Sequence, residues 1–134
     1  MTTMNRVAHF EIHVENLEKA KEFYTQLFGW EIKKWESDKM DYWIIMTGPQ
    51  TEAGGINGGF FKRMGPKPTE GQAVNAYVCT ITVEDIKAMA EKVKSLEGSE
   101  AVPIMPIPGM AWLGYYKDLE GNIFGMIQND TNAK

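Results

Sequence analysis

The chain has 134 residues, of which 43% are hydrophobic and 24% charged, and its formal net charge is -4. This balance predicts one folded domain and excludes a largely disordered chain or a broad nucleic-acid-binding surface. One cysteine, no apolar run of the roughly 20 residues that cross a bilayer and no signal-peptide pattern predict a cytoplasmic protein with no membrane partner.

The first half of the chain predicts a strand, a helix and three further strands. Residues 7–14 alternate between apolar and polar side chains, as a strand with two unlike faces does. Asn16 is a helix N-cap, and apolar residues follow at helical spacing until Gly29 ends the helix. Three strand-like runs come next, over residues 30–35, 42–47 and 55–61.

The second half predicts the same order of elements after a linker over residues 63–72 that contains two prolines and two glycines. Residues 74–83 form a strand whose apolar face includes Tyr77 and Cys79, so Cys79 is expected in the core. Asp85 caps a helix that Gly98 ends. The closing strands are expected over residues 102–107, 111–116 and 123–128.

The two halves are copies of one unit, because matching residues recur at a fixed step of 69 positions. This step carries Asn16 to Asp85, Gly29 to Gly98 and Trp43 to Trp112. We predict an α+β fold in which two βαβββ modules form a curved eight-stranded mixed sheet, with the helices on its convex face. The other face would line a cup where a ligand binds. Residues 1–134 then form a single domain, with module 1 at about 5–62, module 2 at about 73–130 and the linker at 63–72.

Three segments carry a resemblance to a known family: HFEIHVENLEKAKEFYTQLFGWEI, ITVEDIKAMAEKVKSLEG and GYYKDLEGNIFGMIQ. They resemble, in this order, the opening strand and helix, the middle helix and the closing Asp-x-x-Gly-Asn turn of the vicinal oxygen chelate superfamily. This group contains glyoxalases, bleomycin resistance proteins and ring-cleaving dioxygenases. The resemblance implies paired βαβββ modules, a small-molecule ligand and a homodimer.

The resemblance also implies a metal site with one ligand from the first and one from the last strand of each module. His9 stands at the first of these positions, but its counterpart is Val78. The closing strand has Gly125 where the family has a glutamate, and the matching strand of module 1 has Ile56 or Gly58. A Lewis-acid metal needs at least three fixed protein ligands. We therefore expect no cofactor and no metal of the usual kind.

His9, Glu11 and His13 share one face of the first strand, and their role is left open by the sequence. They could hold a divalent metal at a different kind of site, since alternate residues of a strand are roughly 6 to 7 Å apart. Glu11 and His13 could instead transfer protons. The third interpretation is an ordinary polar strand face that orients a ligand.

Two tryptophans and two methionines complete the candidate ligand-binding set, which also contains His9, Glu11 and His13. Trp43 and Trp112 recur at the repeat step, and Met105 and Met110 lie in the proline-rich segment PIMPIPGMAW. Such side chains suit a flat or apolar ligand, whereas core packing is the alternative interpretation for each tryptophan taken singly. The sequence thus predicts a protein that binds a small, partly aromatic molecule without a metal. The alternative is a lyase, isomerase or dioxygenase that uses His9, Glu11 and His13.

Overall fold

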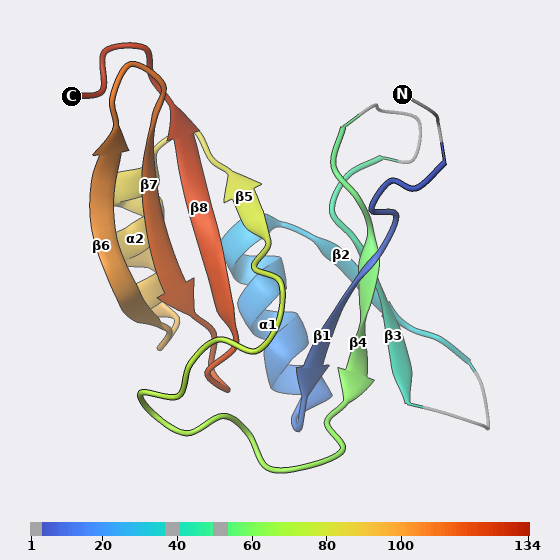
Figure 1. Ribbon diagram of the computed structural model, residues 1–134. Coiled ribbons are helices and arrows are strands. Elements are labelled where there is room, and N and C mark those ends of the chain that lie inside the picture. Colours follow the sequence, from blue (N-terminus) through green and yellow to red (C-terminus); the bar gives the residue numbers. More distant parts are fainter. Residues whose placement is uncertain (1–3, 37–40, 50–53) are drawn as a thin grey trace. The chain divides into compact units, whose positions relative to one another are not determined.

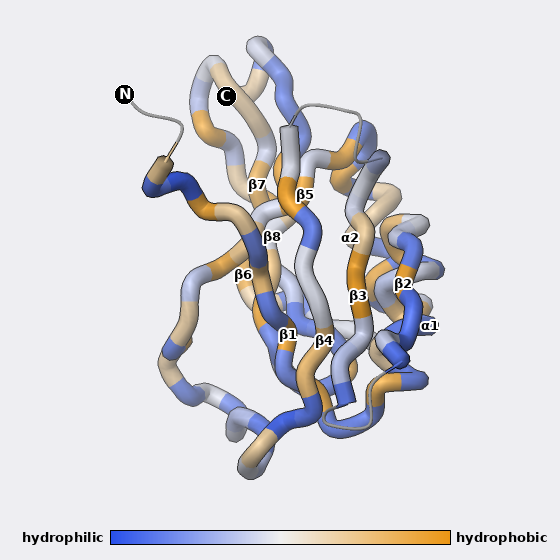
Figure 2. The backbone as a smooth tube through the Cα atoms, turned by 90° about the vertical axis from the view of Figure 1, so that its right-hand side faces the viewer, coloured by the Kyte–Doolittle hydropathy of each residue, from blue (hydrophilic) through white to orange (hydrophobic). Residues whose placement is uncertain are grey.

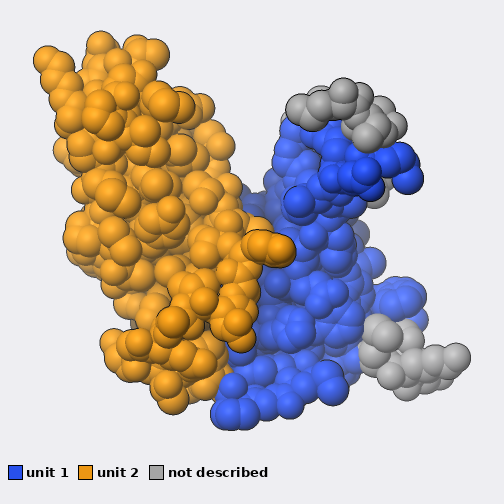
Figure 3. Space-filling view, in the orientation of Figure 1, with its two compact units in different colours: residues 1–66 blue, residues 67–134 orange. Residues whose placement is uncertain are grey.

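The chain divides into two compact units, Met1–Pro66 and Lys67–Lys134 (Figure 3). The computed structural model describes residues 4–36, 41–49 and 54–134. The boundary between the units falls within the predicted linker. In the part of the chain that is described, no helix is long and apolar enough to cross a membrane.

The first unit contains one helix and a mixed sheet of four strands (Figure 1). The strands lie in the order β1-β4-β3-β2, with β1 parallel to β4 and the other pairs antiparallel. The bounds are β1 Phe10–Val14, α1 Leu17–Phe28, β2 Glu31–Lys34, β3 Tyr42–Met46 and β4 Gly58–Lys62.

The second unit repeats this plan in the order β5-β8-β7-β6, again with only the first pair parallel. Its elements are β5 Thr80–Thr82, α2 Ile86–Ser95, β6 Ser99–Ile107, β7 Ala111–Lys117 and β8 Ile123–Asn129. The fold is therefore α+β and consists of paired βαβββ modules, as the sequence predicts. The eight strands hydrogen-bond as two mixed sheets of four.

Each helix covers one face of its own sheet. In the first unit the apolar stripe of α1 packs on the face that bears Trp43, Ile45 and Phe60, and the apolar run of β3 stands out in Figure 2. Tyr24 of α1 stacks on Trp30 with 5.3 Å between the ring centroids and contacts Phe60. In the second unit the buried core consists of Ile86, Ala90, Val93, Ala111, Tyr116, Phe124 and Met126, together with Ala133.

The strand β5 is shorter than predicted, and it lies at one edge of the sheet. Only Thr80–Thr82 pairs with β8, whereas Tyr77 is fully exposed and Cys79 is exposed as well. The prediction that Cys79 belongs to the core is therefore wrong. Alternation of apolar and polar side chains predicts an extended backbone, but it does not predict which of those residues pair with a neighbouring strand.

The end of α2 differs from the expected glycine cap. The Gly98 amide donates to the Val93 carbonyl and the Glu97 amide to the Lys94 carbonyl, which is the Schellman pattern. The residue in the left-handed conformation is Glu97, with φ 69°, and not Gly98. At the end of α1 the corresponding position is Gly29, with φ 74°.

We expect Glu97→Gly to stabilise the protein by about 1 kcal/mol, because glycine adopts a left-handed backbone without the strain that a side chain brings. Urea unfolding followed by circular dichroism measures the change. Glu91→Gly is the matched control within the helical part of α2, where glycine should destabilise by about 1 kcal/mol. Equal effects of the two substitutions would contradict the argument.

Candidate functional site

The face of the first sheet that lies opposite α1 gathers polar and aromatic side chains from three strands. His9, Glu11 and His13 point to the same side as Tyr42 and Phe61, since Glu11 pairs with Gly59 and His13 with Phe61 across the parallel ladder. We call these five residues the polar sheet face.

Two hydrogen-bonded pairs organise the polar sheet face. The Tyr42 hydroxyl lies 3.2 Å from His9 Nε2, and His13 Nε2 lies 3.0 Å from Glu11 Oε1. The side chains of His13 and Glu11 are about half exposed, at 48% and 45%. Each histidine is thus oriented by a neighbour and remains open to a ligand.

Aromatic rings line the same face. The ring of Phe61 lies 4.8 Å from that of Tyr42 and 5.9 Å from that of His13, measured between centroids. Trp35 meets Tyr42 edge-on at 5.8 Å and is 47% exposed. An apolar wall beside polar groups is the composition that small-molecule sites share.

Gly59 explains how Tyr42 can lie across the sheet. A Cβ atom at Gly59 would come within 2.3 Å of the Tyr42 hydroxyl and 2.4 Å of its ring. The phenol therefore occupies the space that a side chain would otherwise fill. Neither Tyr42 nor Phe61 is among the residues that the sequence analysis selects, because their contacts with His9 and His13 depend on strand pairing over long sequence distances.

The environment of Tyr42 raises the pKa of its phenol above the usual value, first through burial and second through the negative charge of Glu11. A raised folded-state pKa means that the folded protein holds its proton more tightly than the unfolded chain. The associated stability is present below the unfolded pKa of about 10 and is lost as the pH rises through the folded pKa.

We expect Glu11→Gln to lower the pKa of Tyr42, because it removes the charge while leaving the burial of the phenol. The shift should be partial, since burial is the larger cause. Phenolate absorbance in an alkaline titration measures it, with Tyr42→Phe identifying the signal of Tyr42 among the five tyrosines. An unchanged pKa in Glu11→Gln would show that the carboxylate does not act on the phenol.

The predicted tryptophans lie elsewhere. Trp43 is buried on the opposite, helix-covered face, where the ammonium group of Lys21 lies 5.8 Å from its ring centroid. In the second unit the Trp112 indole donates to Asp130 at 3.0 Å, on the face of β7 that also bears buried Tyr116. The hydrogen bonds from Asn132 and Trp112 hold the pKa of Asp130 below its usual value.

The two tryptophans are not equivalent, although the fixed step in the sequence pairs them. Trp43 pairs with Phe60, whose counterpart Met126 pairs with Gly114. The residue of the second unit that corresponds to Trp43 is therefore Gly114, and the step of 69 residues is in error by two at this strand. The strand and the loops between the helix and this strand differ in length between the two copies, so one fixed step cannot hold throughout.

The two methionines of the candidate set are exposed at the β6 edge of the second sheet. Met105 lies on β6 opposite Leu113 and is 39% exposed, and Met110 lies in the turn before β7 and is 65% exposed. Both belong to the second unit, whereas the polar sheet face belongs to the first.

The residues at the family's metal-ligand positions do not fit a metal ion. Gly125 lies opposite Thr80, and a Cβ atom there would come within 2.7 Å of the Thr80 hydroxyl. Its counterpart by strand register is Gly59, not Ile56 or Gly58 as the sequence analysis predicts, and its space is occupied by Tyr42. Among the residues that are described, no three His, Cys, Asp or Glu side chains lie close enough to share an ion.

Paired βαβββ modules, each with one helix and a mixed sheet of four strands, define the α+β class of this chain. The sequence model of the Glyoxalase/Bleomycin resistance protein/Dioxygenase superfamily matches residues 6–126. The chain therefore belongs to this superfamily.

Solved structures share the fold at low sequence identity. A glyoxylase/bleomycin resistance protein/dioxygenase domain from Frankia sp. EAN1pec superposes with a TM-score of 0.70 at 14% identity, covering 96% of this chain and 100% of its own. A glyoxalase family protein from Bacillus cereus gives 0.69 at 18% identity, with 96% of each chain covered. The fosfomycin resistance protein FosX from Listeria monocytogenes gives 0.68 at 14%, again with 96% of each covered. No curated protein matches the sequence.

Proposed function

We propose that this protein binds a small, partly aromatic molecule on the polar sheet face, without the metal ion that other family members use. The observation that carries the proposal is the Tyr42 hydroxyl 3.2 Å from His9 Nε2, held over Gly59 beside the half-buried ring of Phe61 and the exposed ring of Trp35. This pair presents directed hydrogen bonds next to a surface on which a flat ring can stack.

The chemistry of the face favours a neutral or weakly polar ligand. Glu11 is hydrogen-bonded to His13, so the face carries a carboxylate and an imidazole in contact and not an isolated charge. Phe61 and Trp35 offer area for stacking, whose strength depends on shape more than on charge. A heterocyclic or phenolic compound meets both requirements.

A thermal-shift screen of aromatic and heterocyclic compounds tests the proposal, followed by calorimetry on each hit. A true ligand should stabilise the folded protein in proportion to its saturation. Tyr42→Phe should weaken its binding about tenfold, as expected for one lost hydrogen bond of about 1.4 kcal/mol. Glu22→Gln, on the exposed side of α1, is the control and should leave binding unchanged. Hits that bind Tyr42→Phe and the parent equally would place the site elsewhere.

Metal analysis tests the second part of the proposal. A mutant of FosX from Listeria monocytogenes has been crystallised with Mn(II) and 1S,2S-dihydroxypropylphosphonic acid, at 16% identity and a TM-score of 0.67 to this chain. We expect this protein, purified without chelators, to contain much less than one equivalent of any transition metal. One equivalent that is lost in His9→Ala would overturn the metal-free proposal.

The hydrogen bond between His13 and Glu11 favours a second candidate function, which is acid–base catalysis by a lyase or isomerase. A histidine oriented by a carboxylate can take a proton from a bound substrate and return it. This candidate requires turnover whose pH profile changes in Glu11→Gln. Binding without turnover would leave only the first proposal.

The predicted homodimer and cytoplasmic location remain predictions of the family resemblance and the composition. Light scattering coupled to size-exclusion chromatography tests the oligomeric state directly.

A further inference from the structure

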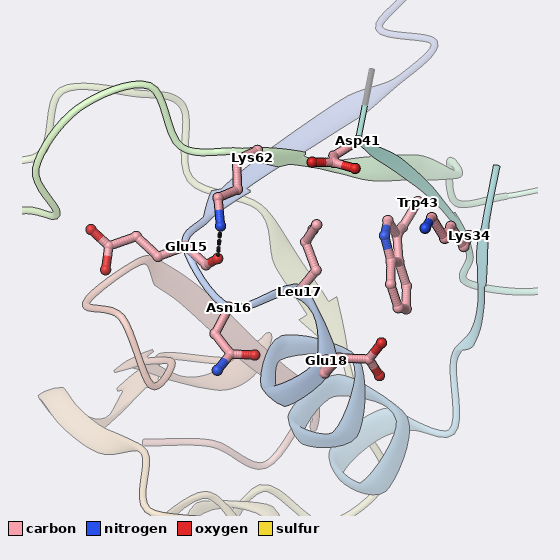
Figure 4. Close-up of a pocket in the computed structure, with 8 residues that line it drawn as sticks. All are labelled: Glu15, Asn16, Leu17, Glu18, Lys34, Asp41, Trp43 and Lys62. Atoms are coloured by element: carbon pink, nitrogen blue, oxygen red, sulfur yellow. Dashed lines mark hydrogen bonds between the residues drawn. The ribbon is translucent and has the colours of Figure 1, made fainter. Parts of the chain in front are cut away.

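A cavity lies in the first unit, on the helix-covered side of the sheet, at the beginning of α1 (Figure 4). Its volume is about 560 Å³, which is within the range of small-molecule sites. We call it the α1 pocket. The residues that line it are Glu15, Asn16, Leu17, Glu18, Lys34, Asp41, Trp43 and Lys62.

Trp43 brings a buried hydrogen-bond donor to this pocket. The side chain is 6% exposed, and its indole nitrogen has no acceptor in the described part of the chain. In Figure 4 this nitrogen is turned toward Leu17 and Asp41, into the space that the lining residues surround. An indole N–H can only donate, and a buried donor without an acceptor destabilises the folded state. A ligand oxygen in the pocket would remove that penalty.

The beginning of α1 supplies further donors. Asn16 accepts from the amide of Lys19 through its side chain and from that of Ala20 through its carbonyl. The amides of Leu17 and Glu18 have no acceptor from the residues that are described. The Lys62 ammonium group donates to the Glu15 carbonyl at 2.6 Å, which uses one of its three protons.

In the second unit, a side chain fills the equivalent position at the beginning of α2. His13 lies opposite Phe61, and its counterpart Thr82 lies opposite Ile127, so the next residues, Lys62 and Gln128, correspond. Gln128 Oε1 accepts from the amide of Ile86 at 2.9 Å, at the beginning of α2. Lysine cannot accept, and Gly114 replaces Trp43 there. Where the second unit has an acceptor, Gln128, the first unit therefore has two donors, Lys62 and Trp43.

The charges around the α1 pocket select the kind of ligand. Besides the donors, the carboxylates of Glu18 and Asp41 line it, against the two ammonium groups of Lys34 and Lys62. Glu15 contributes its backbone, and its carboxylate points away from the pocket (Figure 4). A doubly charged anion such as phosphate would be repelled by the carboxylates. A molecule with one carboxylate and one ammonium group would satisfy both sets, and Leu17 and the Trp43 ring add an apolar wall.

We propose that the α1 pocket binds a small zwitterion of the amino-acid type. Its carboxylate accepts from the Trp43 indole, the Leu17 and Glu18 amides and Lys62, and its ammonium group faces Asp41. This site is separate from the polar sheet face and does not depend on the function proposed there.

Nuclear magnetic resonance with L-leucine as the probe tests the proposal, using ¹⁵N-labelled protein. Of the four indole N–H signals, the one lost in Trp43→Phe belongs to Trp43. L-leucine should move this signal and the Leu17 and Glu18 amide signals along one saturable curve. Its dissociation constant should be at least about tenfold lower than those of acetate, L-leucinamide and inorganic phosphate, each of which lacks one of the paired contacts.

Lys62→Gln is the matched variant, because it copies the arrangement of the second unit. The new side chain should accept from the Leu17 amide and weaken L-leucine binding about tenfold or more, with urea unfolding unchanged. Asp41→Asn should abolish the preference for L-leucine over acetate.

The proposal is overturned by an absence of saturable shifts up to about 100 mM L-leucine, a concentration at which even a millimolar site is filled. Phosphate or acetate binding as tightly as L-leucine would overturn it as well, and so would undiminished binding by a folded Lys62→Gln.

Discussion

Gly58→Ala should destabilise the protein by about 3 kcal/mol, which is a large part of the 5–15 kcal/mol that holds a typical domain together. An added Cβ atom would come within 2.3 Å of the Phe10 carbonyl oxygen and 2.7 Å of the Phe10 ring. The nearest atom belongs to the backbone of β1, so no side-chain rotation relieves the clash. The strand that carries Glu11 and His13 would have to move away from β4.

Urea unfolding of Gly58→Ala and Gly65→Ala measures this effect against a matched control. Gly65 has no atom within 4 Å of its added Cβ and no left-handed backbone, so its substitution should change stability by less than about 1 kcal/mol. Gly59→Ala distinguishes an effect on the geometry of the polar sheet face from an effect on stability. The atoms that it meets belong to the Tyr42 side chain, which can rotate, so we expect a smaller loss of stability but displacement of Tyr42 from His9. Equal stability of Gly58→Ala and Gly65→Ala would show that β1 and β4 separate easily.

The sequence predicts the helices well because their signals are local. Asn16 and Asp85 each accept a hydrogen bond from the amide three residues further on, as N-caps do, and apolar spacing marks the buried stripe. The closing Asp-x-x-Gly-Asn turn is equally local. These local features predict the order of helices and strands along the chain. The family resemblance predicts how the strands are arranged in βαβββ modules.

The candidate site is less predictable because strand register decides it. A fixed repeat step assigns Trp43 to Trp112 and Gly125 to Ile56 or Gly58, whereas the ladders assign them to Gly114 and Gly59. For Gly125 the difference is one or three residues, and an odd difference moves a side chain to the opposite face of a strand. The contact between His9 and Tyr42 spans 33 residues and needs a glycine beneath the phenol, and no local pattern records such a requirement.

The proline-rich segment also shows that strand order and pairing cannot be predicted from a local pattern. Pro103 and Pro106 lie within β6, which is the edge strand of the second sheet, where a missing amide hydrogen is tolerated. The pairing with β7 shifts register on both sides of Val102. The segment was expected to begin as a strand at residue 102, but pairing begins at Ser99. Proline marks an edge strand only once the order of strands is known.

Asp118→Ala should destabilise the protein by about 3 kcal/mol, because this one carboxylate holds the turn between β7 and β8. Asp118 is 7% exposed, and its Oδ1 accepts from the amides of Glu120 and Asn122, both at 2.9 Å. Its Oδ2 accepts from the side-chain amide of Asn122 at 3.1 Å. A hydrogen bond to a charged group contributes about 1.5–3 kcal/mol, and alanine would leave these donors without their acceptor.

Asp118→Asn separates the acceptor from the charge. Its carboxamide oxygen can still accept from the two backbone amides, so we expect a loss of about 1 kcal/mol, roughly a third of the effect of alanine. Thermal unfolding should show the ranking as a fall in Tm of about 10 °C for Asp118→Ala and about 3 °C for Asp118→Asn. Equal losses would mean that the negative charge matters more than the oxygen. If neither variant lost stability, the turn would be held by the main-chain pair between Asp118 and Asn122, since the Asp118 amide donates to the Asn122 carbonyl at 2.9 Å.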